Sequence, residues 1–583
     1  MTNPQSSAWS PLRNRIFFVL WMATLFSNIG TWMNDVGAGW LMTNLSPDPV
    51  MIAAIQAMTT LPVFLLALPA GAIADIFDKR KLLIVVNIMM FFAAALLAVL
   101  VYFNVVSIGW LLLITFILGS GAAFLGPAWQ AIVPGIVAPQ ELKSGIALNS
   151  MGINISRAIG PALAGVLISQ VGLYLPFMLN ALSFIAIIVA VWWWKGEKYK
   201  ENTLPAESVV AAMISGLRYA RYSPALIKTI IRAAAFFVFA SAYWAMLPLV
   251  ARVSLQGDAT LYGILTTSIG IGAVAGAFSL SALRARFSSG ILVTAGSAGT
   301  VIVLVIFAVT TSKYPAIAGS IIAGFSWLIT LSTLMVSAQT ALPDWVRARG
   351  LALYLSVFSG SMALGSLIWG QIASHTSITI ALLAAAAGII VVWLCVLKVK
   401  IDHDTINLSP SEHLTMPEEL PFYSEEDKKP VMVCIQYKVD AEHQAQFFAL
   451  MEQLKRIRLR DGGYSRGLFS VPGTQDEFIE AFMVSSPAEH HRQHKRATVD
   501  DRRIDSQLNA IIRSKTVVHY LSYSVTAGKR NKSGGADNKN NEGHYPADKV
   551  KDTNSHQKKS PVTVYLLTKQ PSNIIMMRWF SHN

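Results

Sequence analysis

Twelve long apolar segments dominate this chain and limit it to folds that a lipid bilayer can hold. Each segment is about 20 residues or longer, which is the length that an α-helix needs to cross a membrane. Of the 583 residues, 53% are hydrophobic and only 14% are charged, whereas soluble domains carry about 25% charged residues. We therefore predict an all-α polytopic membrane protein. The twelve predicted spans lie near 16–42, 50–73, 82–103, 109–134, 144–170, 174–194, 226–250, 260–283, 290–311, 315–338, 350–371 and 378–397.

Two charged residues lie well inside these apolar segments, Asp35 in the first and Arg157 in the fifth, whereas Lys228 and Arg232 lie near the start of the seventh. A charge at the bilayer centre costs roughly 3 kcal/mol, so such residues face a cavity or a partner. The pair is either a buried structural pair or part of a transport pathway, and we favour the pathway. Asn28 and Asn34 share the first segment with Asp35. A single Asn often only joins two helices, but three polar residues on one helix suggest a transport site.

Asp35 and Arg157 lie at depths in the membrane that would allow their side chains to approach each other. Asp35 lies about 20 residues beyond Arg15, hence about 30 Å along a helix. Arg157 lies about 14 residues beyond Lys143, or roughly 21 Å into the fifth span. Burial and a nearby arginine have opposite effects on the pKa of a carboxyl group. We expect Asp35 to couple transport to protons, with Arg157 as its electrostatic partner.

Basic residues alternate between the two sides of the predicted membrane. One side of the membrane carries most of these residues, and the other side carries only Arg252 and Lys313. By the positive-inside rule, both termini lie in the cytoplasm and the protein is a multi-pass protein of the cell (inner or plasma) membrane. The net charge of +14 is then a topology signal rather than a nucleic-acid footprint. The basic side carries Arg13, Arg15, Lys79, Arg80, Lys81, Lys143, Lys195, Lys198, Lys200, Arg218, Arg221, Lys228, Arg284, Arg286, Arg347, Arg349, Lys398 and Lys400.

A polar stretch divides the spans into two sets of six, which is the layout of a transporter built from repeats. After the last span, the predicted order β-α-β-β-α-β indicates a small ferredoxin-like α+β domain. The predicted regions are an N-terminal six-helix half (12–194), a cytoplasmic central loop with an amphipathic helix (195–225), a C-terminal six-helix half (226–400), a linker (401–430), the cytoplasmic α+β domain (431–525) and a disordered tail (526–583).

The α+β domain contains His490 and His494, one helical turn apart in a polar helix predicted from Ser486 to Arg513. Two histidines at this spacing could share a metal. No third ligand stands at a defined spacing, so we prefer a solvated helix face. No metal, cofactor or catalytic group is predicted in this domain.

Two motifs concern helix packing and helix ends. The run GAIADIFDKRK contains Gly71, Asp75, Lys79 and Arg80. Its acid and bases are either a charge network that switches as helices move or only a topology signal. The second motif is the run SRAIGPALAG in the fifth span, which contains Gly160, Pro161 and Gly165. The small glycines permit close helix packing.

These residues resemble the major facilitator superfamily. GAIADIFDKRK is similar to its signature loop, and GPALAG to the motif of its antiporters. Thr115 stands where an intramembrane arginine of this family is expected, which directs attention to Asp35 and Arg157. LRNRIFFVLW and SNIGTWMNDVGAGWLM are similar to the branch of enterobactin exporters and transmembrane secretion effectors. The resemblance covers 12–400 and implies the two-half fold and small-molecule export driven by protons.

Three functions compete. The first is a proton-coupled exporter of a small molecule such as a siderophore, drug or metabolite, working by alternating access. The second is a proton-coupled importer. The third is a membrane-tethered regulator or enzyme that acts through 431–525, a region that resembles the dimeric α+β barrels of antibiotic-biosynthesis monooxygenases. Because that region shows no catalytic constellation, we expect no enzyme. The expected partners are a small molecule, protons and the bilayer, and the C-terminal domain could self-associate.

Overall fold

The computed structural model describes residues 9–194, 209–396, 407–411 and 430–522. They form two compact units, a helical bundle and a small α+β domain. The predicted disordered tail, most of the predicted linker and residues 195–208 of the central loop lie outside the described residues.

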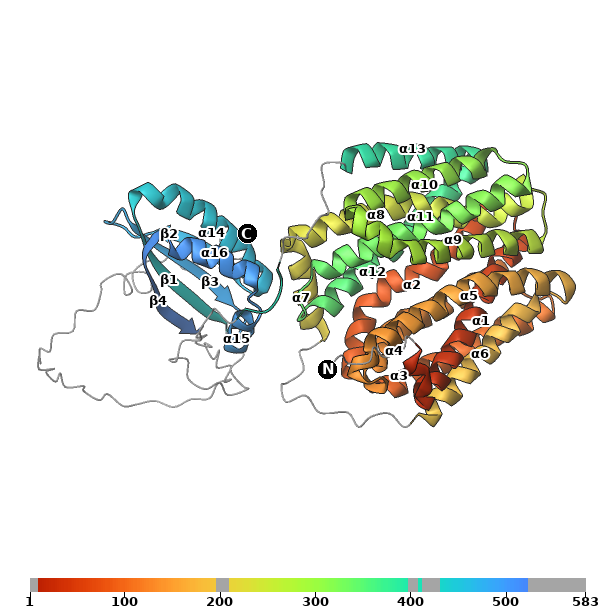
Figure 1. The fold of residues 1–583 in the computed structure, drawn as a ribbon, viewed down its shortest axis with the longest axis horizontal. Helices are drawn as coiled ribbons and strands as arrows, with labels where there is room; N and C mark the ends of the chain where they lie inside the picture. Colours follow the sequence, from red (N-terminus) through yellow and green to blue (C-terminus); the bar gives the residue numbers. More distant parts are fainter. Residues whose placement is uncertain (1–8, 195–208, 397–406, 412–429, 523–583) are drawn as a thin grey trace, which may run out of the picture. The chain divides into compact units, whose positions relative to one another are not determined.

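The bundle confirms the twelve predicted spans, since the described residues contain twelve helices long and apolar enough to cross a membrane. Most of their ends lie within a few residues of the predicted ones. In Figure 1, the six helices of each half lie side by side, the N-terminal half from red to yellow and the C-terminal half from yellow to teal. The first half consists of α1 (Arg15–Leu45), α2 (Pro49–Ile76), α3 (Lys79–Tyr102), α4 (Ile108–Ile136), α5 (Leu142–Gln170) and α6 (Tyr174–Trp193). The second consists of α8 (Pro224–Leu249), α9 (Ala259–Arg286), α10 (Ser289–Val309), α11 (Lys313–Thr340), α12 (Arg347–His375) and α13 (Ile378–Val396).

Capping side chains mark the start of several of these helices. Asn14 accepts hydrogen bonds from the backbone of Ile16 and Phe17 at the start of α1. Asp78 does the same for α3, and Asp258 accepts one from Leu261 in α9. Such side chains satisfy backbone donors that have no partner within the helix. The polar residues between spans thus fix where each helix starts.

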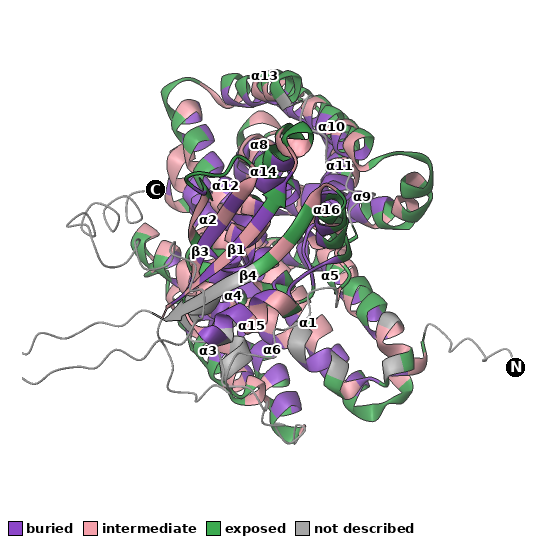
Figure 2. Ribbon diagram, turned by 90° about the vertical axis from the view of Figure 1, so that its left-hand side faces the viewer, coloured by how far each residue is buried: buried purple, intermediate pink, exposed green. Residues whose placement is uncertain are grey.

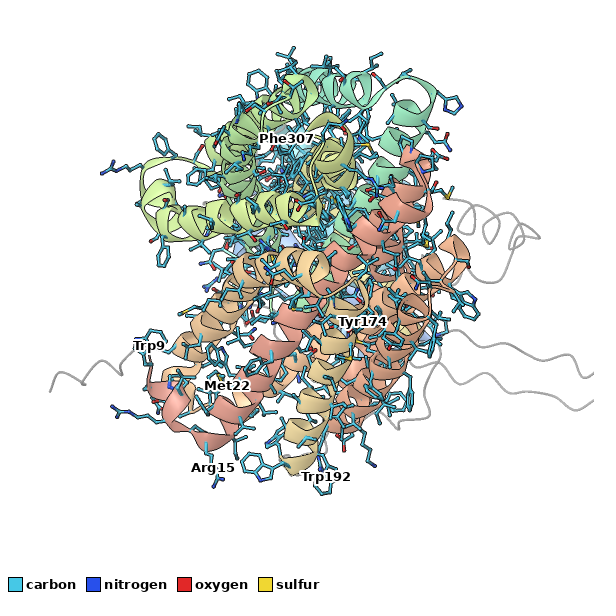
Figure 3. The ribbon with its side chains drawn as sticks, turned by 90° about the vertical axis from the view of Figure 1, so that its right-hand side faces the viewer. Trp9, Arg15, Met22, Tyr174, Trp192 and Phe307 are labelled. Atoms are coloured by element: carbon cyan, nitrogen blue, oxygen red, sulfur yellow. The ribbon has the colours of Figure 1, made fainter. Side chains whose placement is uncertain are left out.

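The central and peripheral helices of the bundle differ in burial. In the apolar 18-residue window of the span that joins α8 to the π-helical turn η3 (Val250–Ser254), 72% of the residues are buried, against 28% in the window of α13. Figure 2 shows α13 largely in the exposed colour. Figure 3 shows Arg15 and Trp192 at one edge of the N-terminal half, where Arg15 also lies 5.6 Å from the ring of Trp193. An apolar surface of this extent matches lipid rather than water.

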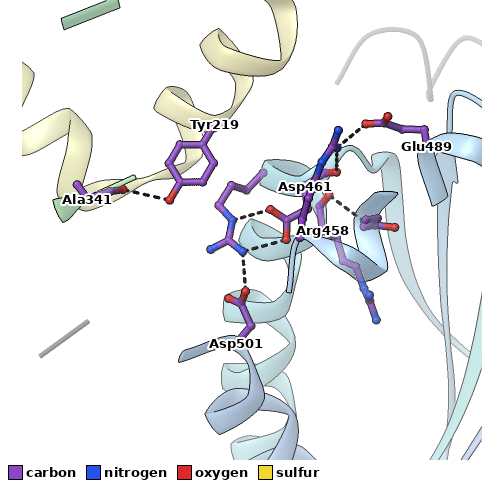
Figure 4. A network of polar contacts seen from close by, with 9 residues as sticks. Tyr219, Ala341, Arg458, Asp461, Glu489 and Asp501 are labelled. Atoms are coloured by element: carbon purple, nitrogen blue, oxygen red, sulfur yellow. Dashed lines mark hydrogen bonds and ion pairs between the residues drawn. The ribbon is translucent and has the colours of Figure 1, made fainter. Parts of the chain in front are cut away.

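Helix α7 (Val209–Tyr222) precedes the second half and packs against it through one face. Ser215 accepts a hydrogen bond of 2.7 Å from Arg349 at the start of α12. The hydroxyl of Tyr219 donates to the carbonyl of Ala341, at 3.1 Å, in the loop between α11 and α12 (Figure 4). Ile214 and Leu217, on the other face, are exposed. The apolar exposed face is typical of a helix at a membrane surface.

The C-terminal unit is a four-stranded antiparallel sheet in the order β2-β3-β1-β4. Alternate residues of β1 are buried under the helices, among them Val433 and Tyr437, which share a core with Phe447 of α14. The element order and strand order are those of a ferredoxin-like domain. Its elements are β1 (Val431–Val439), α14 (Gln444–Asp461), β2 (Tyr464–Ser470), β3 (Glu477–Val484), α15 (Pro487–Lys495), α16 (Val499–Asn509) and β4 (Ile512–Ser522).

Two expectations for this domain were wrong. The polar segment predicted as one helix from Ser486 to Arg513 is two helices, α15 and α16, and strand β4 already begins at Ile512. The face that carries His490 is not solvated, because His490 and Gln493 are each only 3% exposed. The polar sequence concealed this burial because hydrogen bonds between polar side chains replace apolar contacts there.

Candidate functional site

A cavity of about 230 Å³ lies inside the bundle between the two halves. Residues from seven helices line it, and these helices come from both halves. Sites between repeats are typical of secondary transporters. The lining residues are Trp32, Asp35, Val36, Gly39, Ile52, Ile55, Gln56, Thr59, Thr60, Arg157, Trp244, Ala245, Pro248, Tyr262, Thr266, Trp327, Phe358 and Met362.

The cavity brings together Asp35 and Arg157, the two charges singled out in the sequence. Asp35 comes from α1 and Arg157 from α5. The guanidinium of Arg157 lies 5.3 Å from the ring centroid of Trp32, a cation–π contact. Its Nε atom is buried and has no hydrogen-bond partner among the described residues. Within the described part of the chain, neither charge has an ion-pair partner within 4.0 Å.

A wall of aromatic rings surrounds these charges. Trp32 of α1 lies 6.5 Å from Trp244 of α8, measured between ring centroids. Trp244 lies 5.5 Å from Trp327 of α11, and Trp327 lies 6.2 Å from Phe358 of α12. Our sequence reasoning missed this wall. The available signal was the position of these tryptophans in the middle of spans, since interfacial Trp stands at span ends.

The two asparagines grouped with Asp35 do not line the cavity. Trp32, Asp35 and Gly39 share one face of α1, because residues three and four apart in a helix are neighbours. Asn34 precedes Asp35 and therefore points about 100° away. It is buried, and no described residue hydrogen-bonds to its Oδ1 atom. Asn28 lies further along α1 toward the end of the bundle that carries Arg15.

The glycine–proline motif of α5 lies at two helix contacts. A methyl group on Gly160 would lie 2.6 Å from the Cβ atom of Trp32 in α1. One on Gly165 would lie 3.0 Å from the carbonyl oxygen of Ala259 and 3.2 Å from the Cα atom of Gly263, both in α9. The absence of side chains lets α5 approach α1 and also the other half. The motif therefore supports both the position of Trp32 in the wall and the contact between halves.

The halves also meet at the end of the bundle where α1 ends, which we call the Arg252 end. Arg252 donates to Thr43 at 2.8 Å and also to Asn44. Its guanidinium lies 5.5 Å from the ring of Trp40, which stacks on Tyr262. These contacts and those of Gly165 join the two halves at this end. The contact of Arg252 between the halves was not predicted, although Arg252 is one of two bases on a side with few charges.

The signature loop lies at the opposite end, which we call the basic end. Gly71 and Asp75 belong to the last turns of α2, and the side chain of Asp75 lies outside the described ones. Asp78 caps α3, where the family signature has glycine. Arg80 donates to the carbonyl oxygens of Val191, at 3.0 Å, and Trp192, at 2.6 Å.

The contacts of Arg80 join two helix ends. Lys79, the first residue of α3, is half-buried beside it. Arg80 itself satisfies the free carbonyl groups at the end of α6, where the helix dipole favours a positive charge.

The family model described as transmembrane secretion effector matches residues 6–527. The chain therefore belongs to this family of major facilitator transporters. The match includes the C-terminal α+β domain as well as the bundle.

Curated relatives of the chain are transporters. The staphyloferrin A transporter of Staphylococcus aureus is 26% identical over 42% of this chain and 62% of its own length. Macrolide efflux protein A of Streptococcus pyogenes is 22% identical over 30% of this chain and 42% of its own length. The matches thus span about half of these relatives. A solved POT family transporter in complex with 5-aminolevulinic acid shares the fold, with a TM-score of 0.56 at 13% identity, covering 68% of this chain and 97% of its own.

Proposed function

We propose that this protein is a proton-coupled exporter of a small molecule. The cavity carries the proposal: it lies between two six-helix halves and holds two opposite charges that no other described residue neutralises by an ion pair. An acid kept away from its base in the membrane is expensive unless a proton or a ligand uses it. The relatives whose names mention efflux support export, as does the glycine–proline motif of α5. Import is the alternative, and it differs only in the direction of coupling.

Alternating access would open and close the two ends of the cavity. In the described structure the halves are joined at the Arg252 end by the contacts of Arg252 and of Gly165 with Gly263. Breaking these contacts while the basic end closes would move the cavity from one side to the other. Asp75, Lys79 and Arg80 would then form a charge network that rearranges with the ends of α2, α3 and α6.

Asp35 is the proposed proton-coupling group. It is the single carboxyl group among the residues that line the cavity. Arg157 is its electrostatic partner in the proposed cycle. A change in the distance between them would change the proton affinity of Asp35, and each pKa unit corresponds to about 1.4 kcal/mol.

An export screen tests the function directly. Cells that lack their own efflux pumps would express the chain and be offered siderophores, macrolides and cationic dyes. The compound that accumulates less is then measured in vesicles under an imposed pH gradient. Asp35→Asn should reduce gradient-driven transport to background. The matched control is Asp48→Asn, because Asn also caps helices well and Asp48 lies at the start of α2 outside the cavity. Full transport by Asp35→Asn would refute its role.

The proposed topology places both termini, the central loop and the C-terminal domain in the cytoplasm. Cysteines introduced near Asp48, Ser107 and Ser377 should react with an impermeant thiol reagent in intact cells. A cysteine at Lys198 should react only after permeabilisation. Labelling of that cysteine from outside would reverse the assignment.

The C-terminal domain has a proposed regulatory or self-association role rather than an enzymatic one. A variant that ends at Ser424 should still transport the compound found in the screen, and its particle mass in detergent should fall by more than the removed residues if the domain holds copies together. A complete loss of transport with normal membrane insertion would place an essential step in the domain.

A further inference from the structure

The charges of the cavity indicate the class of ligand. Asp35 and Arg157 are opposite in sign and line one cavity, yet neither has an ion-pair partner within 4.0 Å among the described residues. A buried charge without a partner is costly, and its partner can come from a ligand. A ligand with a single charge would pair with one of the two side chains. The other side chain would remain a buried charge without a partner.

The walls indicate the rest of the ligand. Trp32, Trp244 and Trp327 present rings from three helices, and Phe358 extends the series from a fourth. Pockets lined mainly by aromatic side chains with a few polar groups bind compact apolar bodies and orient them. Trp32 also holds the guanidinium of Arg157 against its face. An acidic group bound to Arg157 would therefore lie next to an aromatic surface.

We propose that the cavity binds a small amphoteric molecule, with an acidic group on Arg157, an amino group on Asp35 and a flat apolar body against the tryptophans. This inference rests on the proposed function and deepens it, since it names the class of substrate. The titratable side chains in the lining are Asp35, Arg157 and Tyr262. An amino group and a proton would compete for Asp35, and such mutual exclusion is what exchange of a substrate for a proton requires.

Three probes with the same indole ring separate the two charges. L-Tryptophan has both groups, tryptamine only the amine and indole-3-propionate only the acid. Binding to the purified full-length chain in lipid nanodiscs is measured by titration calorimetry. L-Tryptophan should bind at least about tenfold more tightly than either analogue, the effect of roughly one charged hydrogen bond.

Variants assign each preference to a side chain. In Arg157→Gln, L-tryptophan should bind no more tightly than tryptamine. In Asp35→Asn, L-tryptophan should bind no more tightly than indole-3-propionate. Asp48→Asn and Lys313→Gln change charges at span ends outside the cavity and should alter none of the affinities. Size-exclusion profiles of every variant confirm that it is folded.

The outcomes separate this inference from the proposed function. If tryptamine and L-tryptophan bind with equal affinity, and do so in Arg157→Gln as well, the cavity is a cation site and the proposal is overturned. Tightest binding of indole-3-propionate would make it an anion site and also overturn it. Absence of binding by all three probes contradicts an aromatic amphoteric ligand. In each case, gradient-driven transport of the compound found in the screen would show that the exporter assignment still stands.

Discussion

The two units of this protein bury charge in opposite ways. In the C-terminal domain, Glu480 is 0% exposed and accepts hydrogen bonds from Arg466, at 2.6 Å, and from Tyr437, at 3.0 Å. In the bundle, Asp35 and Arg157 line a cavity without an ion-pair partner among the described residues. The domain therefore pairs its buried charges internally, whereas two buried charges of the bundle have no ion-pair partner among the described residues.

The pairing in the domain extends beyond Glu480. Arg460 donates to Asp461 at 2.8 Å and to Asp501 at 2.7 Å, which ties α14 to α16 (Figure 4). Arg496 donates to Glu489 at 2.6 Å. Paired buried charges contribute little net stability, but removing one partner costs several kcal/mol. A buried charge thus has a structural role where it is paired and indicates a functional site where it is not.

The largest effect should come from removing the unpaired base. Arg157→Met should reduce transport to background because the electrostatic partner of Asp35 and the proposed anion ligand are both lost. It should leave the thermal stability of the bundle unchanged or higher, since no ion pair is broken and a desolvated charge disappears. A thermal denaturation curve of the purified protein measures this. A marked fall in stability would show that Arg157 is structural, as Glu480 is.

Removing a paired acid should do the reverse. Glu480→Ala should destabilise the C-terminal domain by about 3–5 kcal/mol, because Arg466 is left buried without its carboxylate. Hydrogen exchange of 431–522 in the full chain reports this change. Glu452→Ala breaks an exposed pair with Lys455 and should cost at most about 1 kcal/mol. Equal exchange in the two variants would contradict the comparison.

A smaller effect depends on pH. Burial lowers the pKa of His490 to about 4 from the usual 6.5, so the folded domain keeps this ring neutral where the unfolded chain protonates it. The contribution of His490 to the free energy of unfolding is fully present above pH 6.5. It falls as the pH drops toward 4, by at most about 1.4 kcal/mol per pH unit. Urea titrations of the domain signal between pH 7 and 4 measure the slope, and His490→Gln should flatten it. An unchanged slope would assign the pH dependence to other groups.

The smallest effects on folding should come from the signature loop. Arg80→Ala removes two hydrogen bonds to the end of α6, at a cost of about 1–3 kcal/mol, and Asp75→Asn removes one charge. Both should leave the amount of protein in the membrane near normal while lowering the transport rate. Normal transport by both variants would reduce the loop to a topology signal, without a part in switching.

Much of the fold could be predicted because it depends on local sequence. Each of the twelve spans is long and apolar by itself, and the capping residues mark where helices begin. The elements of the C-terminal domain also follow from local patterns, except that one polar segment concealed two helices. The site was only partly predictable. Asp35 and Arg157 could be singled out because a charge in an apolar segment is conspicuous, whereas Trp244 and Trp327 look like ordinary apolar residues of their spans.

The sequence by itself determined twelve segments long and apolar enough to cross a membrane and singled out Asp35 and Arg157 within two of them, because length, apolarity and charge are properties of each segment alone. Only the tertiary structure decided that Asp35 faces the cavity and Asn34 does not, because that depends on the rotation of α1 about its axis. Only the packing of the helices placed Arg157 and three tryptophans from different helices around one cavity. It also placed Arg252 against Thr43 and Asn44 of the other half, since contacts between distant segments are set by how helices fit together.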